Sequence, residues 1–345
     1  MRGENRAPTP STEGTAGSTA APTMRAVVHD TYGSSDVLRL TTLPRPRPGA
    51  HDVLVRVAAA GLDRGAWHAM TGLPYLSRLF FGPRRPSNPV LGTEVAGSVV
   101  ALGAAVTGFA VGDEVFGFGR GTFAEYALVA EDRLAAKPAG LSFAQATTLP
   151  VSAVTALQAV HDRGRVQAGQ EVLVIGASGG VGSYAVQLAR SAGAHVTGVC
   201  SPAKADLVRS LGAEHVVDRT REDFADGTRR YDLIIDIAGN PSLSRLRRAL
   251  TPRGTAVLTG GEDGGSLTGG MSRQLRAVAL SPFIGQRLTS FIADVRTRDL
   301  DRLTALIEDG DLAPSLQRTY PLDQAVVAMR ALETGTARGK VALTV

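Results

Sequence analysis

Residues 171–200 have the sequence EVLVIGASGGVGSYAVQLARSAGAHVTGVC, and this stretch decides the fold. It opens with a short β-branched run over residues 171–177. Apolar residues from Val181 to Ala189 then recur at the spacing of one helix face, and residues 195–200 form a second apolar run. The turn ASGGVG at residues 177–182 is an A-x-G-x-x-G version of the dinucleotide-binding fingerprint. Because it follows a strand and opens a helix, we expect a dinucleotide cofactor to bind here.

The glycines of this turn predict how a pyrophosphate would be held. Gly179 lets the backbone approach the phosphates, and Gly182 permits close packing of the helix on the strand. The N–H groups and the dipole at the start of the helix attract negative charge. We therefore expect the pyrophosphate to contact Ser178, Gly179, Gly180, Val181 and Gly182.

The same rhythm of strands and helices continues downstream. Further apolar strands are predicted at residues 214–218, 231–239, 255–261 and 288–294, with amphipathic helices at 204–213 and 243–250. Continuous apolar strands that alternate with helices are typical of a parallel sheet covered on both faces. The sequence thus predicts an α/β, doubly wound Rossmann domain over residues 149–294.

The rest of the chain has a different pattern. Short apolar runs separated by Gly, Pro and Asp turns predict a barrel-like all-β domain over residues 24–148. Residues 295–345 carry two helices and a last strand at 340–345; they are too few to fold alone, so we expect them to complete the β domain, which is then discontinuous. Residues 1–23 are rich in Thr, Ala, Gly, Ser and Pro, which predicts a disordered tail.

Composition excludes several classes of protein. The 345 residues include one cysteine, so neither a disulfide framework nor a Cys-rich metal site is expected. The longest uncharged run, residues 95–112, is broken by glycines, and the first residues lack the apolar core of a secretory signal. The net charge is +5, but the arginine clusters lack an accompanying aromatic pattern. We expect a cytoplasmic protein whose partner is a small molecule rather than nucleic acid or membrane.

The end of the second Rossmann strand indicates which dinucleotide binds. An NAD site has Asp or Glu there to bond the ribose hydroxyls. Here residues 199–204 are VCSPAK, with no acid before Asp206. The hydroxyl of Ser201 and the ammonium of Lys204 would hold a 2′-phosphate, and Arg219 would add a second cation. The sequence therefore predicts NADPH.

Four segments together resemble the medium-chain dehydrogenase/reductase superfamily, and most closely its zinc-independent, quinone oxidoreductase-like branch. They are GTEVAGSVVALGAAVTGFAVGDEVFGF (92–118), PVSAVTALQAV (150–160), GASGGVG (176–182) and ARGKVALTV (337–345). The resemblance runs from Met24 to Val345. It implies a GroES-like β-barrel catalytic domain, a Rossmann domain, an active-site cleft between them, and a homodimer paired through the strand at residues 288–294.

The zinc ligands of related enzymes are replaced in this chain. Where zinc-dependent relatives have G-x-C-x-(S/T)-D-x-H, residues 61–68 are GLDRGAWH, so Asp63 stands at the cysteine position. Where they have G-H-E, residues 92–94 are GTE. Thiolate and imidazole are the preferred ligands of zinc, so we expect none to be bound. The stretch also departs from the G-V-N-P-x-D of quinone reductases.

The absence of zinc chemistry favours acceptors that spread negative charge themselves. We therefore predict NADPH-dependent hydride transfer to a quinone or to the activated C=C bond of an α,β-unsaturated carbonyl. The resemblance implies that Thr155 and Phe283 border the nicotinamide and that Lys340 reaches the cofactor from the other domain. Ala238 and Gly260 follow sheet strands, at the edge where ligands bind in such sheets.

Three residues are candidates for the catalytic chemistry. Asp63 is expected as a solvated, ionised carboxylate that bonds a ribose or substrate hydroxyl. His68 aligns with a relay histidine of zinc relatives, and Tyr75 lies in a Pro- and Gly-rich insertion, residues 71–89, expected at the substrate mouth. Three alternatives remain open: a metal-free alcohol or carbonyl dehydrogenase, an enoyl-thioester reductase, and a non-catalytic NADPH-binding sensor.

Overall fold

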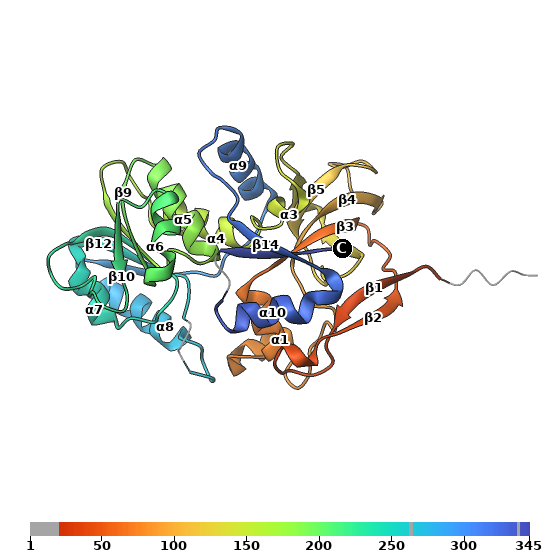
Figure 1. Cartoon of the computed structure of the whole chain (residues 1–345), viewed down its shortest axis with the longest axis horizontal. Coiled ribbons are helices and arrows are strands. Elements are labelled where there is room, and N and C mark those ends of the chain that lie inside the picture. Colours follow the sequence, from red (N-terminus) through yellow and green to blue (C-terminus); the bar gives the residue numbers. More distant parts are fainter. Residues whose placement is uncertain (1–20, 262–264, 337–338) are drawn as a thin grey trace, which may run out of the picture.

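The computed structural model describes residues 21–261, 265–336 and 339–345. The chain forms two halves side by side, an α/β half and a β-rich half joined near the middle of the long axis (Figure 1). Most of the predicted tail, residues 1–20, lies outside the described residues, and the first strand already begins at Thr23.

The α/β half is built on a six-stranded sheet in which every strand pair is parallel. The strand order is β10-β9-β8-β11-β12-β13, which is 3-2-1-4-5-6 in chain order, the arrangement of a dinucleotide-binding Rossmann fold. The predicted doubly wound fold is confirmed. The strands are β8 (Glu171–Ile175), β9 (His195–Cys200), β10 (His215–Asp218), β11 (Tyr231–Asp236), β12 (Leu250–Leu258) and β13 (Arg287–Ser290).

Helices cover both faces of this sheet. Separate apolar clusters lie on its two sides, one including Val172 and Val174 and the other Leu173 and Ile175, as alternation along β8 requires. The helices are α4 (Ser152–Leu157), continued by the π-helical turn η4 (Gln158–Arg163), and α5 (Gly180–Ser191), η5 (Pro202–Lys204), α6 (Ala205–Ser210), α7 (Leu243–Ala249), α8 (Met271–Leu280) and η6 (Ser281–Phe283).

The β-rich half has the GroES-like fold that the resemblance implies. Its main sheet runs β14-β15-β3-β4-β5-β7, with β6 also paired to β3, and β1 and β2 form a separate hairpin. The strands are β1 (Thr23–Val28), β2 (Arg39–Pro44), β3 (Asp52–Leu62), β4 (Glu94–Leu102), β5 (Glu114–Phe118), β6 (Tyr126–Ala130), β7 (Leu134–Ala136), β14 (Leu316–Pro321) and β15 (Lys340–Thr344).

The C-terminal segment contacts both halves. Strand β15 pairs antiparallel with β3, and β14 pairs parallel with β15. Helix α10 packs on α1 and β3, whereas α9 packs on α4 and β7. The remaining helices are η1 (Ser35–Val37), α1 (Arg64–Thr71), η2 (Tyr75–Ser77), α2 (Arg78–Phe81), η3 (Glu131–Arg133), α3 (Phe143–Ala146), α9 (Thr297–Glu308), η7 (Leu322–Gln324) and α10 (Ala325–Glu333).

Some elements differ from the sequence-based expectation. Strand β13 ends at Ser290, so the predicted strand at residues 288–294 was too long. Strands β2, β7 and β14 and helices α1 and α8 were not predicted. In β14, Tyr320 is the one buried residue, so the strand lacks the apolar run from which a strand is predicted. Across the described ranges, no helix combines the length and the apolar character needed to cross a bilayer.

Candidate active site at the junction of the two domains

The glycine turn before α5 has the shape that a pyrophosphate site needs. A Cβ atom on Gly182 would lie 2.1 Å from the carbonyl oxygen of Gly176, so the helix rests directly on the end of β8. At Gly179 the nearest obstacle is the same oxygen, at 3.4 Å, which leaves the turn open from outside. Gly179 is also the N-cap of α5, and no side chain of the described chain caps that end. The residues present therefore fit a bound pyrophosphate.

The other residues predicted to contact the pyrophosphate lie around the glycine turn. Ser178 is buried, and Val181 packs against the core between α5 and the sheet. A Cβ atom on Gly180 would lie 3.0 Å from Ser152 Oγ and 3.1 Å from Lys340 Cδ. The β-rich half therefore reaches the start of α5 through the side chain of Lys340.

Three predicted phosphate ligands lie together at the ends of β9 and β10. The backbone N–H of Arg219 donates to the carbonyl of Cys200 at 3.0 Å, and that of Lys204 donates to Ser201 at 2.9 Å. Burial raises the pKa of the Cys200 thiol, while Arg209, Lys204 and Arg219 oppose the rise. The structure thus gathers cations at the edge where a 2′-phosphate would lie.

Two charged residues at this edge were not predicted. Arg209, on α6, adds a third cation and pairs with Asp206 at 3.0 Å. Asp218, the last residue of β10, also lies at this edge, but it accepts hydrogen bonds from the N–H and the hydroxyl of Thr220 at 2.9 and 2.7 Å. These bonds hold its carboxylate in its own turn, and they lower its pKa.

The middle of the sheet edge is formed by small residues. A Cβ atom on Gly176 would lie 2.9 Å from Cβ of Ala238, which places the ends of β8 and β11 in contact. A Cβ atom on Gly260 would lie 1.8 Å from the carbonyl oxygen of Ile237. The predicted positions Ala238 and Gly260 therefore share the carboxyl edge with the glycine turn, at the point where the strand order reverses.

A buried ion pair stabilises the loops at this edge of the sheet. Arg273 of α8 pairs with Asp236, the last residue of β11, at 2.5 Å, and it donates to the carbonyls of Pro241 and Gly260 at 3.1 and 3.2 Å. Burial raises the pKa of Asp236 to about 6, although the Arg273 guanidinium opposes the rise. The pair fixes the loops that follow β11 and β12.

A second buried ion pair lies where the two domains meet. Lys340 and Glu94 form an ion pair, and both side chains are buried. The Lys340 ammonium also donates to the carbonyl of Leu62 at 3.0 Å, and Glu94 accepts a hydrogen bond from the backbone N–H of Val151 at 2.9 Å. Burial raises the pKa of Glu94 to about 7; Lys340 opposes the rise and Asp63 adds to it. Residues from three distant segments thus converge on one buried carboxylate.

Asp63 is not the solvated carboxylate that we expected. It is buried and is the N-cap of α1: one oxygen accepts a hydrogen bond from the N–H of Ala66 at 2.7 Å. The other accepts a hydrogen bond from the hydroxyl of Thr93 at 3.2 Å. The sequence-based expectation failed because nothing in the local sequence showed that β4 would cover this position. Asp63 therefore acts in this structure as a helix cap that ties α1 to β4.

Replacing Asp63 should have a modest effect on stability. We expect Asp63→Ala to lower the free energy of unfolding by about 1 kcal/mol, the usual value of an N-cap. Asp63→Asn, which keeps a capping oxygen, should lose less. Urea unfolding followed by circular dichroism measures both, and equal losses in the two variants would contradict the capping role.

His68 and Tyr75 lie beside the seam between the domains. His68 of α1 hydrogen-bonds through Nδ1 to the carbonyl of Leu73 at 2.5 Å, which fixes the start of the insertion. The backbone N–H groups of Tyr75 and Leu76 donate to the carbonyls of Ser266 and Leu267, at 2.7 and 3.1 Å. The insertion thus crosses from one domain to the other, with the Tyr75 side chain half-exposed.

The two predicted nicotinamide neighbours lie in different parts of the Rossmann domain. Thr155 is on α4, and its hydroxyl donates to the carbonyl of Val151, one helical turn earlier. The same helix begins with Ser152, whose side chain lies near Gly180 of the glycine turn. Phe283 is 84% exposed and precedes β13, so it lies at the amino end of that strand. The prediction for Phe283 is wrong, because cofactors of such sheets lie at the opposite, carboxyl edge.

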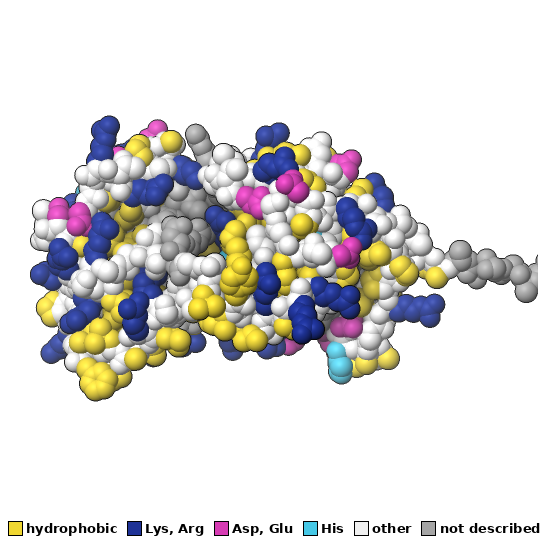
Figure 2. All heavy atoms as spheres, turned by 90° about the horizontal axis from the view of Figure 1, so that it is seen from below, with side chains coloured by type: hydrophobic (Ala, Val, Ile, Leu, Met, Phe, Trp, Pro, Cys, Tyr) yellow, Lys and Arg dark blue, Asp and Glu magenta, His cyan; other side chains and the backbone are white. Residues whose placement is uncertain are grey.

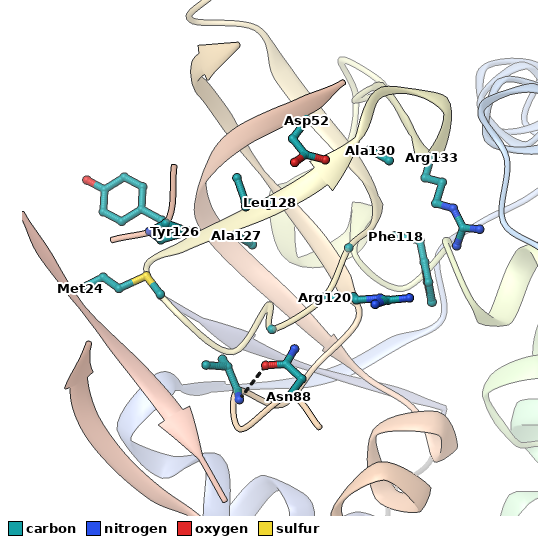
Figure 3. A pocket seen from close by; sticks show the side chains of 14 residues that line it. Met24, Asp52, Asn88, Phe118, Arg120, Tyr126, Ala127, Leu128, Ala130 and Arg133 are labelled. Carbon is teal, nitrogen blue, oxygen red and sulfur yellow. Dashed lines mark hydrogen bonds between the residues drawn. The ribbon is translucent and has the colours of Figure 1, made fainter. Parts of the chain in front are cut away.

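The β-rich half also contains a groove of about 570 Å³ (Figure 3). Its wall includes Gly119 and Gly121, whose N–H groups donate to the carbonyls of Thr93 and Gly92, so it backs onto the strand that carries Glu94. Its lining includes a single carboxylate, Asp52, which already accepts a hydrogen bond from Gly49. Because no residue of the glycine turn or of the Rossmann sheet lines it, the groove does not form part of the candidate active site.

The donors at the junction do not suit zinc. Within the residues that the structure describes, no three His, Cys, Asp or Glu side chains come close enough to hold a metal ion. The two carboxylates that stand at ligand positions of zinc-dependent relatives are bound to protein donors, Asp63 to Ala66 and Thr93, and Glu94 to Lys340.

Comparisons with known proteins agree with this architecture. A family profile described as an alcohol dehydrogenase GroES-like domain matches residues 49–139, and one described as a zinc-binding dehydrogenase matches residues 211–343. A chloroplastic quinone oxidoreductase of Triphysaria versicolor is 31% identical over 335 residues, which cover 92% of this chain and 97% of the relative. A 2-methylene-furan-3-one reductase of Solanum lycopersicum is also 31% identical, over 93% of this chain and 79% of the relative.

A solved structure shows the same fold over nearly the whole chain. The quinone oxidoreductase of Coxiella burnetii superimposes with a TM-score of 0.83 at 27% identity, covering 94% of this chain and all of the other. The sequence match, the paired domains and the glycine turn agree, and the chain belongs to the medium-chain dehydrogenase/reductase superfamily of oxidoreductases, in its quinone oxidoreductase-like branch.

Proposed function

We propose that the chain is an NADPH-dependent, zinc-independent reductase that transfers hydride to a quinone or to the activated C=C bond of an α,β-unsaturated carbonyl. The observation that carries the proposal is the bonding of Asp63 and Glu94. Both carboxylates bind protein donors, so the junction is poorly suited to hold a Lewis acid that would neutralise an alkoxide. Quinones and conjugated carbonyls delocalise the charge that hydride addition creates, so they need no such group.

The choice of NADPH is supported by the charges at the edge of the sheet. Ser201, Lys204 and Arg219 lie together after β9 and β10, with Arg209 nearby. Cations and a hydroxyl suit a 2′-phosphate, whereas the acid that would bond an unmodified ribose is missing after β9.

Each part of the site has a task in this reaction. When bound, NADPH supplies the hydride. The N–H groups at the start of α5 hold the pyrophosphate, and the small residues Gly176, Ala238 and Gly260 leave room at the sheet edge for the rest of the cofactor. The Lys340–Glu94 pair positions the β-rich half against α5. The phenol of Tyr75, in the segment that spans the two domains, is our candidate for the proton donor.

A charge reversal tests the 2′-phosphate assignment. We expect Lys204→Glu to raise the KM for NADPH about 10- to 100-fold, since a charge-assisted hydrogen bond is worth roughly 1.5–3 kcal/mol. The KM for NADH should change little, because NADH carries no 2′-phosphate. Steady-state kinetics with each cofactor and one common acceptor measures both. Equal changes in the two KM values would contradict the assignment.

A panel of acceptors tests the reaction itself. The purified protein is assayed with NADPH and NADH against quinones, enones, enals, enoyl thioesters, simple ketones and alcohols, with metal analysis of the same sample. Turnover of quinones or enones with NADPH and without zinc supports the proposal. Turnover of only enoyl thioesters or only alcohols would favour the corresponding alternative, and binding of NADPH without turnover would favour a sensor. Stoichiometric zinc whose removal abolishes turnover would refute it.

A further inference from the structure

An exposed apolar surface lies along the lower side of the molecule, near the seam between the domains. The segment of η2 and α2 contributes Leu79 and Phe80, 73% and 75% exposed, together with the less exposed Leu76. Leu267, also exposed, comes from the facing domain and lies beside Leu76, because the N–H of Leu76 donates to its carbonyl. Such large side chains are rarely left in water without a role.

Helix α8 extends this surface. It begins beside the insertion, since a Cβ atom on Gly269 would lie 2.6 Å from Pro74. Its outer face exposes Leu275 and Val278, three residues apart, while the residues that face the sheet are buried. In Figure 1, α1 and α8 both lie on the lower side, and Figure 2, seen from below, shows hydrophobic side chains near the middle of this face, with Lys and Arg and fewer Asp and Glu around them. We call these six residues the lower apolar surface: Leu76, Leu79, Phe80, Leu267, Leu275 and Val278.

The segment that carries Leu79 and Phe80 contains only basic charged residues. Residues 64–93 contain four arginines and no Asp or Glu. The N–H of Ser87 donates to the carbonyl of Phe81 at 2.7 Å, so Arg84 and Arg85 lie in a turn folded back on α2. Both are exposed, and neither forms an ion pair within the described ranges. Arg276 lies on α8 between Leu275 and Val278, and it too is exposed.

The segment is held firmly enough to present these side chains. The Arg78 guanidinium stacks on the rings of Tyr32 and Tyr75, at 4.4 and 4.8 Å, and its Nε donates to the carbonyl of Gly72 at 3.0 Å. The hydroxyl of Tyr32 donates to the carbonyl of Gly82 at 2.6 Å. Leu79 and Phe80 are therefore held outward at the end of a braced loop.

We propose that the lower apolar surface docks the protein peripherally on a membrane that contains anionic lipids. Apolar side chains flanked by arginines match a bilayer interface, where the side chains enter the acyl boundary and the guanidinium groups bind lipid phosphates. A second copy of the chain fits less well, because it would bring the same arginines against each other. The expectation of no membrane partner rested on the lack of a spanning segment, which has no bearing on a peripheral contact. The proposal is independent of the reaction catalysed.

Vesicle sedimentation tests the docking. The full chain is mixed with vesicles of phosphatidylcholine alone or of phosphatidylcholine with phosphatidylglycerol, at low and at high salt. We expect binding to the phosphatidylglycerol vesicles, weakened by salt, and at least tenfold weaker binding to phosphatidylcholine alone. Each arginine near an anionic surface contributes about a fivefold change in partitioning, so Arg84→Glu with Arg85→Glu should reduce binding by more than tenfold.

Matched variants distinguish binding through the lower apolar surface from nonspecific hydrophobic adsorption to vesicles. Leu79→Ser with Phe80→Ser should reduce binding to phosphatidylglycerol vesicles at least tenfold, whereas Val111→Ser, which removes an exposed apolar side chain from the loop between β4 and β5, should leave it unchanged. Thermal unfolding confirms that the variants are folded; if the apolar pair does not fold, the arginine pair and the salt dependence decide. Absence of vesicle binding by the unaltered protein would overturn the proposal, as would equal losses in Val111→Ser. Sedimentation velocity that shows the apolar pair dissociating an oligomer, with no vesicle binding, would assign the surface to a second copy instead.

Discussion

Replacing Lys340 by Met should lower the free energy of unfolding by about 3–5 kcal/mol, the usual result of removing one partner from a buried ion pair. Glu94 would then lie buried without a cation, against a backbone that leaves no room to move. A Cβ atom on Gly61 would already lie 2.4 Å from the Glu94 carboxylate, so this side chain fills its site closely. Chemical denaturation at about pH 9, where Glu94 of the folded protein is ionised, measures the loss.

The pH dependence of this loss identifies its cause. Glu94 has an ordinary pKa of 4.5, and its pKa is about 7 in the folded protein, so the folded state binds the extra proton between these values. Stability from this group is therefore complete below about pH 4.5 and decreases as the pH rises toward 7. Without the Lys340 ammonium the folded pKa rises further, so the deficit of Lys340→Met should be small in acid and largest above pH 7.

A double variant provides the control. Lys340→Met with Glu94→Gln removes both charges, and most of the lost stability should return, because no bare carboxylate remains buried. A single-variant deficit that is the same at every pH, or a double variant no more stable than the single one, would show that packing rather than charge is responsible.

Replacing Gly182 by Ala should cause the second large effect, because the new Cβ atom would meet the carbonyl oxygen of Gly176 at 2.1 Å and Cα of Ala177 at 2.8 Å. Helix α5 would have to move off the end of β8. Overpacking of this kind costs about 1–3 kcal/mol and occasionally more. We expect a lower melting temperature and a loss of NADPH binding of at least about 100-fold, measured by the fluorescence of the bound cofactor.

Gly179→Ala is the matched control, because its Cβ atom would meet only the oxygen of Gly176, at 3.4 Å. The melting temperature should therefore change little. NADPH binding should still weaken, by about tenfold or more, because the methyl group occupies the open side of the turn that the pyrophosphate approaches. Equal losses of stability in both variants would contradict the separate roles assigned to the two glycines.

The α/β half was predictable because its strands are apolar on both faces. Strand β8 and its neighbours appear in the sequence as uninterrupted runs, and the glycine turn marks where the first helix begins. Helix α8 escaped prediction for a physical reason. Its buried positions include Arg273 and Ala277, while Leu275 and Val278 are exposed, so its apolar pattern points away from the core. The ion pair of Arg273 with Asp236 and its hydrogen bonds to the carbonyls of Pro241 and Gly260 stabilise that orientation.

The candidate site was predictable where its residues are close together in the sequence. Prediction failed where the site depends on distant segments. The glycine turn at residues 177–182 is one continuous stretch of sequence. The Glu94–Lys340 pair joins residues 246 positions apart, and only the pairing of β15, β3 and β4 brings them together. Asp63 was misjudged for the same reason, since Thr93 reaches it from the neighbouring strand. For Phe283, similarity to a family loop outweighed the direction of β13, and the prediction was wrong.

The position of Lys340 on β15 has a consequence for how the protein is made. Its ammonium bonds the carbonyl of Leu62, a residue 278 positions earlier. A ribosome that adds roughly 5–20 residues per second needs tens of seconds to cover that distance. During this time the nascent β-rich half has β3 and β4 but lacks the cation that Glu94 requires. The β-rich half therefore cannot complete its buried ion pair until translation reaches the last strand.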